Sequence, residues 1–441
     1  MAGDSTAAVP TLPGYIWRTA EAPEAVARAL AAALDLPLPL AALLASRGHD
    51  SADTAAAFLE PLKQKLADPM DVAELREAAQ RVQQTITAGG EIVVFGDFDV
   101  DGVVGTALLT DMIAHLGGRV RHFLPDRHTE GYGLTPAALE RCLAASEPAL
   151  FITVDCGMGA TELLANLQAR GIRLLVTDHH TLAGSFPDDC IVVNPHRETM
   201  PSPMRYLCGA GVAFQLACAL VRQRGDKPGE RRRLSGWLEA VAIATVADVV
   251  PLLGDNRTLV AHGLRALNRR PRVGLRELMR KSGISNRTID SYHLGFVLGP
   301  CLNAAGRMET AEPAYRLLTT GDVDEARKLS MQLDNANAQR KSTEQALLEQ
   351  AAGQLEEWFD AGRHGAVVVG GTGWHGGTVG IVAARLMNLH HRPAAVVVLD
   401  GEGGGRGSLR ADQAYNAVEA LKACGEHLER MGGHARAAGF T

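Results

Sequence analysis

The chain has 441 residues, 46% of them hydrophobic and 21% charged, and its 50 acidic and 44 basic side chains give a net charge of −6. These values exclude a histone-like basic protein and a highly charged disordered chain, and the length suggests about two to three domains. The seven cysteines are scattered without a CxxC pair, which favours reduced thiols in the cytoplasm, and neither a signal peptide nor a membrane span is recognisable.

The first part of the chain is rich in alanine and leucine and is predicted to be helical. Residues 1–20 are expected to form a loose arm, and helices are expected over most of 23–90. Asp71 can cap the last of these helices, and the Gly89-Gly90 pair can end it. We assign residues 1–70 to an N-terminal arm with helices.

Short runs of β-branched and apolar residues then alternate with helical segments. The runs are expected to form strands at 92–95, 119–125, 150–155, 172–178 and 190–195. Apolar strands that alternate with helices favour a parallel sheet that is covered on both faces. Further helices are expected over 209–248 and 258–281.

A long helical segment separates this region from a second α/β unit. Residues 323–362 have helical spacing without proline, and a helix of that length would span about 50 Å, which suits a connection between domains. Strands at 366–371 and 394–400, a glycine-rich loop at 401–407 and a last helix are expected to follow. The predicted fold class is therefore α/β, with a parallel-sheet domain at 71–322, a long connecting helix at 323–362 and a smaller α/β domain at 363–441.

Acidic side chains stand where three of the expected strands and one helix end. These residues are Asp97, Asp99 and Asp101 after the first strand, Asp155 after the third, Asp178 with His179 and His180 after the fourth, and Asp248 after an apolar helix. The carboxyl ends of parallel strands meet at one edge of a sheet, so we expect these side chains to converge there. Three acids within five residues repel one another unless a cation is bound.

Each segment also has a less specific interpretation. The DxDxDG spacing begins an EF-hand calcium loop, but Leu108 stands where that loop needs a bidentate glutamate, and a strand precedes it in place of a helix. A solvated acidic turn at 97–101 and a simple turn former at Asp248 remain as alternatives. Neighbouring side chains in extended backbone point opposite ways, so one histidine of the pair is expected on a metal and the other on substrate.

Together the acids and imidazoles can hold two divalent ions. An oxygen-rich set with one imidazole suits Mn²⁺ best and Mg²⁺ less well, and no ligand set for structural zinc is present in the sequence. Two ions about 3.5–4 Å apart can clamp the attacking and leaving oxygens of a phosphoryl group. The residues therefore predict metal-assisted hydrolysis of a phosphoester or phosphoanhydride.

The segments DFDVDG, VDCG, TDHH and VAD, in this order, resemble the first four motifs of the DHH phosphoesterase superfamily. Five more segments resemble the RecJ family of single-strand-specific 5′-to-3′ DNA exonucleases, namely 123–134, 299–308, 371–386, 407–413 and 432–439. Phe98 and Val100 replace a frequent Tyr and Ala of the family, and neither is a ligand type. The resemblance covers about residue 30 to the end.

The resemblance implies a parallel-sheet DHH domain, a smaller DHH-associated domain and two Mn²⁺ ions. It implies metal ligands at Asp97, Asp99, Asp101, Asp155, His179 and Asp248, with Asp155 as the bridge. His180 would touch the scissile phosphate, and Asp178 would orient His179. The implied reaction is the release of 5′ mononucleotides from single-stranded DNA in DNA repair and recombination.

The resemblance also implies residues that bind the substrate and its 5′-terminal phosphate. They are Arg127, Tyr132, Asn303, Arg307, His375, Ser408, Arg410 and His434. Arginine suits bidentate phosphate contacts, the tyrosine would stack on a base, and the two histidines would line the cleft between domains. A surface or structural role is the alternative for each of them.

The implied partners are single-stranded DNA, a RecQ-type helicase and a single-strand-binding protein, for a monomer in the cytoplasm at the nucleoid. Family members continue beyond the last motif into an OB-fold, so we expect a shortened form. The basic runs at 222–233 and 265–281 either follow a DNA backbone or form solvated helix faces.

Two other functions remain as alternatives. One is a DHH hydrolase of nanoRNA, cyclic dinucleotides or pyrophosphate, whose relatives lack the N-terminal helices and the long helix. The other is a non-enzymatic replication scaffold, whose relatives have lost metal ligands that this chain keeps.

Overall fold

The computed structural model describes residues 21–127, 129–131, 133–182, 184–401 and 403–441. It divides into two compact units with the boundary between Leu66 and Ala67. Within these described ranges, no helix combines the length and the apolar character needed to cross a membrane.

The first unit is a small helical cluster. It contains α1 (Glu24–Leu34), α2 (Leu38–Ser46), α3 (Ala52–Leu59) and the short η1 (Pro61–Lys63). Ser51 begins α3 with a capping box in which its hydroxyl accepts the Thr54 amide. The core of this unit contains Leu30 and Leu44 together with small residues such as Ala41, which allow the helices to pack closely.

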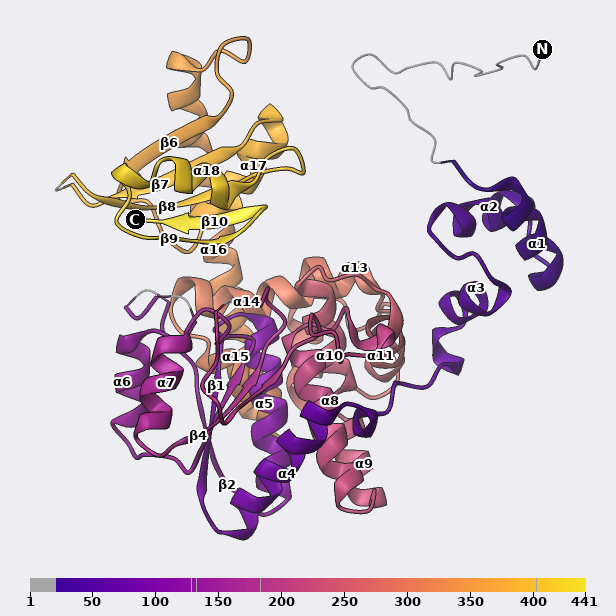
Figure 1. Ribbon diagram of the computed structural model, residues 1–441. Helices are drawn as coiled ribbons and strands as arrows, with labels where there is room; N and C mark the ends of the chain where they lie inside the picture. The colour runs from indigo at the N-terminus through magenta and orange to yellow at the C-terminus, as the bar shows by residue number, and fades with distance from the viewer. Residues whose placement is uncertain (1–20, 128, 132, 183, 402) are drawn as a thin grey trace. The chain divides into compact units, whose positions relative to one another are not determined.

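The second unit contains a five-stranded parallel sheet in the order β2-β1-β3-β4-β5, which confirms the predicted fold class (Figure 1). Its strands are β1 (Glu91–Gly96), β2 (Arg119–Phe123), β3 (Leu150–Val154), β4 (Arg173–Thr177) and β5 (Cys190–Val193). The residues of β3 are all buried, as expected for a parallel strand with helices on both faces.

Helices cover the two faces of this sheet. One face packs on α6 (Pro136–Leu143) and α7 (Thr161–Ala169), whose Leu139 and Leu164 join Phe95 and Phe151 in one core cluster. The helices α4 (Ala73–Thr87), α5 (Val100–His115) and α8 (Gly209–Gln223) lie on the other side (Figure 1).

Asp71 does not cap α4, contrary to the expectation from the sequence. It lies inside the short helix η2 (Pro69–Asp71), and the Asp68 carboxylate caps that turn by accepting the Met70 amide at 3.0 Å. The N-cap of α4 is Val72, and the apolar side chain of this valine cannot accept a hydrogen bond. The aspartate that acts as a cap is therefore Asp68, three residues before the predicted Asp71, and it caps η2 and not α4.

A helical layer follows β5 and ends in a long helix. Its elements are η3 (Ser202–Met204), α9 (Pro228–Ser235), α10 (Leu238–Ala247), α11 (Gly254–Leu267), α12 (Val273–Lys281), α13 (Ser291–His293), the π-helical η4 (Leu294–Leu298), α14 (Gly299–Met308), α15 (Glu312–Thr319) and α16 (Val323–Trp358). Asp322 caps α16 by accepting the Glu325 amide at 2.7 Å, and the helix ends four residues before the predicted 362.

The C-terminal part contains a mixed sheet in the order β6-β7-β8-β10-β9. Its elements are β6 (Val367–Thr372), α17 (Val379–His390), β7 (Ala394–Leu399), β8 (Gly405–Arg410), α18 (Ala417–Ala423), η5 (Gly425–His427), β9 (Met431–His434) and β10 (Ala437–Phe440). Only β6 and β7 pair in parallel.

The sequence predicted a loop over the whole glycine-rich segment 401–407. This was wrong for its last residues, because β8 begins at Gly405. A Cβ on Gly405 would lie 2.7 Å from the Val398 carbonyl oxygen, and one on Gly407 would overlap the Phe440 ring. The strand therefore needs glycine for close packing, although glycine is a poor signal for a strand.

Candidate metal centre

Three of the predicted carboxylates are placed by the ladder of the parallel sheet itself. Asp97, Asp155 and Asp178 each follow the last residue of a strand. Their amides continue the ladder by donating to the carbonyls of Val154 at 3.2 Å, Thr177 at 2.9 Å and Val193 at 3.2 Å, respectively. The carboxyl ends of β1, β3 and β4 therefore present the three side chains at one edge, as predicted.

The loop after β1 is folded by its own carboxylates and one glycine. Asp99 is the N-cap of α5, and its Oδ1 accepts the amides of Asp101 at 2.9 Å and Gly102 at 3.2 Å. A Cβ on Gly102 would lie 2.6 Å from the backbone nitrogen of Asp97. Glycine at this position therefore lets the start of α5 lie against the end of β1.

Asp101 is fixed by a helix from a distant part of the chain. Its carboxylate accepts the amides of Gly209 at 2.6 Å and Ala210 at 2.9 Å, at the N-terminus of α8. Burial raises the pKa of Asp101, although His179 and the Ala210 amide oppose the rise. The helix N-terminus thus compensates a buried charge, a role that the sequence reasoning missed.

Asp155 lies at the centre of the site and has an unusual backbone. Its φ is +61°, in the left-handed region that few residues other than glycine, asparagine and aspartate adopt. The Asp155 side chain is buried, and a Cβ added to Gly209 would lie 2.6 Å from the Cβ of Asp155. Burial raises the pKa of Asp155 well above its ordinary value, and Asp101 and Asp99 add to this.

His179 lies among three of these carboxylates. Its Nε2 lies 3.1 Å from Asp155 Oδ1, 3.6 Å from Asp248 Oδ2 and 3.7 Å from Asp101 Oδ2. Burial lowers the pKa of His179, which favours the neutral imidazole that binds metals. Asp248 ends α10, and burial with Asp101 and Asp99 nearby raises its pKa to about 9.

Asp178 orients His180 and not His179, so this part of the prediction was wrong. Its Oδ1 lies 2.7 Å from His180 Nδ1, whereas it contacts His179 only through the backbone amide. Its Oδ2 accepts the Met158 amide at 3.0 Å. Burial raises the pKa of Asp178, but the hydrogen bond with His180 outweighs it, and the net pKa is lowered.

The donor set fits divalent cations. Three groups, each with ligand atoms within 4.8 Å of one another, are Asp97-Asp99-Asp155, Asp101-His179-Asp248 and Asp155-His179-His180. Among the residues described, the buried oxygens Asp155 Oδ1 and Asp248 Oδ2 have no hydrogen-bond partner. Asp155 belongs to two of the groups. Adjacent carboxylates with raised pKa values, whose buried oxygens face an imidazole without a hydrogen bond to it, are what a bound cation would stabilise.

A basic cluster lies near this centre. Burial lowers the pKa of Arg307 to about 10, with the positive charge of Arg127 next in importance and that of Arg410 also contributing, whereas Asp99 opposes the shift. Arg410 donates to Ser408 Oγ at 2.6 Å. A Cβ on Gly380, in the first turn of α17, would lie 2.6 Å from Arg410 Nη2. The predicted phosphate-binding residues therefore converge near a helix N-terminus, which favours an anion.

Other predicted substrate residues have mixed positions. His434 stacks on His180, with ring centroids 5.2 Å apart and planes at 10°. Asn303 uses its side-chain oxygen to accept the Val100 amide at 2.7 Å, so this atom supports the loop before α5. His375 Nδ1 accepts the Gly377 amide at 3.1 Å within its own turn. Tyr132 lies outside the described residues.

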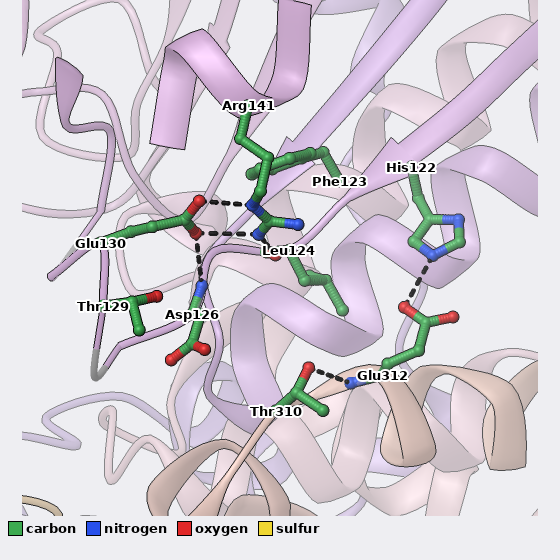
Figure 2. A pocket seen from close by; sticks show the side chains of 9 residues that line it. All are labelled: His122, Phe123, Leu124, Asp126, Thr129, Glu130, Arg141, Thr310 and Glu312. Atoms are coloured by element: carbon green, nitrogen blue, oxygen red, sulfur yellow. Dashed lines mark hydrogen bonds and ion pairs between the residues drawn. The ribbon is translucent and has the colours of Figure 1, made fainter. Parts of the chain in front are cut away.

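A pocket of about 460 Å³ lies away from the predicted ligands, at the end of β2 (Figure 2). His122 and Glu312 face each other there at 3.0 Å, and Arg141 pairs with Glu130 across it. None of the predicted metal ligands lines this pocket.

The basic run at 222–233 lies far from the centre. Helix α8 extends about 22 Å from the Asp101 contact at Gly209 to its end at Gln223. Arg224 pairs with Glu230, and Arg233 pairs with Asp111. In the second run, Arg272 pairs with Glu239. These positions favour the structural interpretation of the first run and partly of the second.

Two family models match the chain. The model described as "DHH family, N-terminal domain" matches residues 91–245, and the "DHHA1 domain" model matches residues 363–441. The two matches fall on the parts that contain the parallel and the mixed sheet.

Similar proteins carry one name. The chain is 36% identical over 403 residues to "Single-stranded-DNA-specific exonuclease RecJ" of Bacillus subtilis, covering 91% of this chain and 50% of the relative. The chain thus spans about half the length of this curated relative. The RecJ of Dickeya dadantii is 34% identical, with 92% of this chain and 72% of the relative covered.

Solved structures of RecJ proteins resemble this chain as well. A crystal structure of exonuclease RecJ bound to manganese has a TM-score of 0.73 and 37% identity, and the match covers 84% of this chain and 90% of that one. A crystal structure of RecJ from Thermus thermophilus in complex with Mn²⁺ has a TM-score of 0.80 and 34% identity, with 96% and 59% covered.

Proposed function

The chain belongs to the RecJ family, and from this we propose that it is a metal-dependent exonuclease specific for single-stranded DNA. The observation that carries the proposal is the convergence of Asp97, Asp155, His179 and Asp248 from separate elements around a place suited to cations. Related structures with manganese support Mn²⁺ as the ion.

We further propose that two ions bind, one to Asp97-Asp99-Asp155 and the other to Asp101-His179-Asp248. Asp155 would be shared between them, because its Oδ1 also lies 3.1 Å from His179 Nε2 of the second group. When bound, such ions polarise a phosphoryl oxygen and supply hydroxide near neutral pH. The α8 N-terminus holds Asp101 for this purpose, and Gly209 leaves room for Asp155.

His180 is proposed to contact the scissile phosphate. Its Nδ1 lies 2.7 Å from Asp178 Oδ1, and its ring nitrogen groups with Asp155 and His179 at the proposed centre. Stacking on His434 holds the ring from its face. The pair of contacts therefore fixes the orientation of a phosphate-binding imidazole.

The direction of cleavage is proposed to be 5′ to 3′, with release of 5′ mononucleotides. Arg127, Arg307, Ser408 and Arg410 would bind the 5′-terminal phosphate. The three arginines place positive charge beside the metal centre and the first turn of α17, and the Ser408 hydroxyl lies 2.6 Å from Arg410 Nη1. Recognition of the terminal phosphate at a fixed distance from the ions sets the size of the product.

The test is digestion of oligonucleotides labelled at the 5′ or the 3′ end, with Mn²⁺ and with Mg²⁺. The proposal predicts that a 5′ label is released at once as a mononucleotide, and that a 3′-labelled strand shortens progressively. Cleavage of only dinucleotides, cyclic dinucleotides or pyrophosphate, with long strands left intact, would favour another DHH hydrolase. The 36-residue helix α16 argues for the exonuclease.

We also propose a domain division at 71–322, 323–362 and 363–441, a role in DNA repair and recombination, and action as a monomer. A RecQ-type helicase and a single-strand-binding protein are the proposed partners. A blunt duplex compared with a 5′-tailed duplex tests the need for a helicase, because only the tailed duplex should be degraded.

A further inference from the structure

The two most exposed Tyr, Phe or Trp side chains of the described residues lie against each other. Tyr292 is 60% exposed and Phe296 is 70% exposed. Their rings stack with centroids 5.0 Å apart and planes at 26°. An aromatic side chain usually gains stability by burial, so a stacked pair that stays open to solvent indicates a surface for another flat or apolar group.

Backbone packing places this pair near the proposed metal centre. A Cβ on Gly295 would lie 3.3 Å from Val246 Cγ1, and one on Gly299 would lie 2.9 Å from Ala247 Cβ, so η4 and the first residue of α14 pack directly on the last turn of α10. Asp248 is the next residue. With 3.8 Å between successive Cα atoms, the backbones of Phe296 and Asp248 lie within about 20 Å.

The backbone at both sides of this contact departs from regular structure. Helix η4 is a π-helix, a conformation that often occurs at functional sites. Val249, directly after Asp248, has a φ of +61° and is 86% exposed. A β-branched residue in the left-handed region is strained, and strained backbone is frequent at functional sites.

We propose that Tyr292 and Phe296 form a stacking platform for bases of the single strand, which rests on the proposed exonuclease function. Because η4 packs on the last turn of α10, the platform lies within about 20 Å of Asp248, a distance that at most about six nucleotides span at a stacked spacing of 3.4 Å. Every base has a flat face, so such a platform holds the strand without sequence preference. It would keep the remaining strand bound after each mononucleotide leaves.

The test compares the wild type with the double variant Y292A/F296A on a thymidine 20-mer with Mn²⁺. Loss of one base stack predicts a rise in KM of about 5- to 150-fold, with a much smaller change in kcat. The single variant F296W should keep most of the affinity, because indole also stacks. L389A, which removes another exposed apolar side chain at 65% exposure, is the matched control and should leave KM unchanged.

A second readout uses 2-aminopurine in the strand, with metal chelated so that the strand remains intact. Its fluorescence should be quenched by the wild type when the probe is within about six nucleotides of the 5′ end, and not by Y292A/F296A. A double variant with wild-type KM and quenching would overturn the platform and leave the exonuclease proposal standing. A wild type that neither cleaves nor binds single strands would overturn the proposed function itself.

Discussion

Replacement of Gly209 by alanine should disable the metal centre through a single added methyl group. The new Cβ would lie 2.6 Å from Asp155 Cβ and 2.8 Å from Asp155 Oδ1. Carbon atoms normally approach to about 3.5–4.0 Å, so the Asp155 carboxylate or the start of α8 must move by about 1 Å. Metal ligation tolerates about 0.2 Å, and a displacement of about 1 Å can cost roughly a hundredfold in rate.

The assay measures Mn²⁺ affinity by calorimetry and nucleotide release from a single strand. G209A should bind Mn²⁺ at least tenfold more weakly and lose about a hundredfold in kcat/KM. Overpacking should also lower the free energy of unfolding by about 1–3 kcal/mol, so folding is checked by circular dichroism. The matched control is G353A in α16, where no atom lies within 4 Å of the added Cβ.

G353A should be fully active and slightly more stable, by about 0.5–1 kcal/mol, because alanine is the better helix former. A folded G209A protein with wild-type Mn²⁺ affinity and rate would refute the assignment of Gly209 as the residue that makes room for Asp155.

Three further outcomes are expected. D155A should lose both ions and nearly all activity, and two ions retained at normal affinity would exclude it as the shared ligand. D178N should lower kcat about 10- to 100-fold with little change in Mn²⁺ affinity, because Asp178 holds the His180 ring. A selective loss of Mn²⁺ affinity would instead indicate that Asp178 orients His179. Mn²⁺ at 100 times its Kd should stabilise the protein by about 2.7 kcal/mol, which is about 3 °C in Tm for two-state unfolding of Ala67–Thr441, and calorimetric scans without any shift would contradict a built cation site.

The parallel sheet could be predicted because its strands carry their own signal. The runs that became β1 and β3 are short, apolar and rich in β-branched residues, and each is followed by a helix with a polar start. The rule that parallel strands end at one edge then brought Asp97 and Asp155 together without any structure. By contrast, β8 and β10 consist mainly of glycine, alanine and arginine, which are poor signals for a strand, and the two pair with each other across an intervening helix and strand.

The metal-ligand residues could be predicted from the sequence, but the hydrogen bonds that hold their side chains in place could not. The amides of Gly209 and Ala210 reach Asp101 across more than a hundred residues, and a peptide amide leaves no mark in the sequence. The partner of Asp178 depended on the turn after β4, which directs the His180 ring back to it. Side-chain direction at the end of a strand is set by such local turns, and the alternation rule for extended backbone no longer applies there.

Anomalous diffraction from crystals soaked in manganese measures the main claim most directly. Two peaks are expected, one among the carboxylates of Asp97, Asp99 and Asp155 and the other between Asp101, His179 and Asp248. A soaked crystal with no peak among these side chains, or with manganese bound only elsewhere, would contradict this claim.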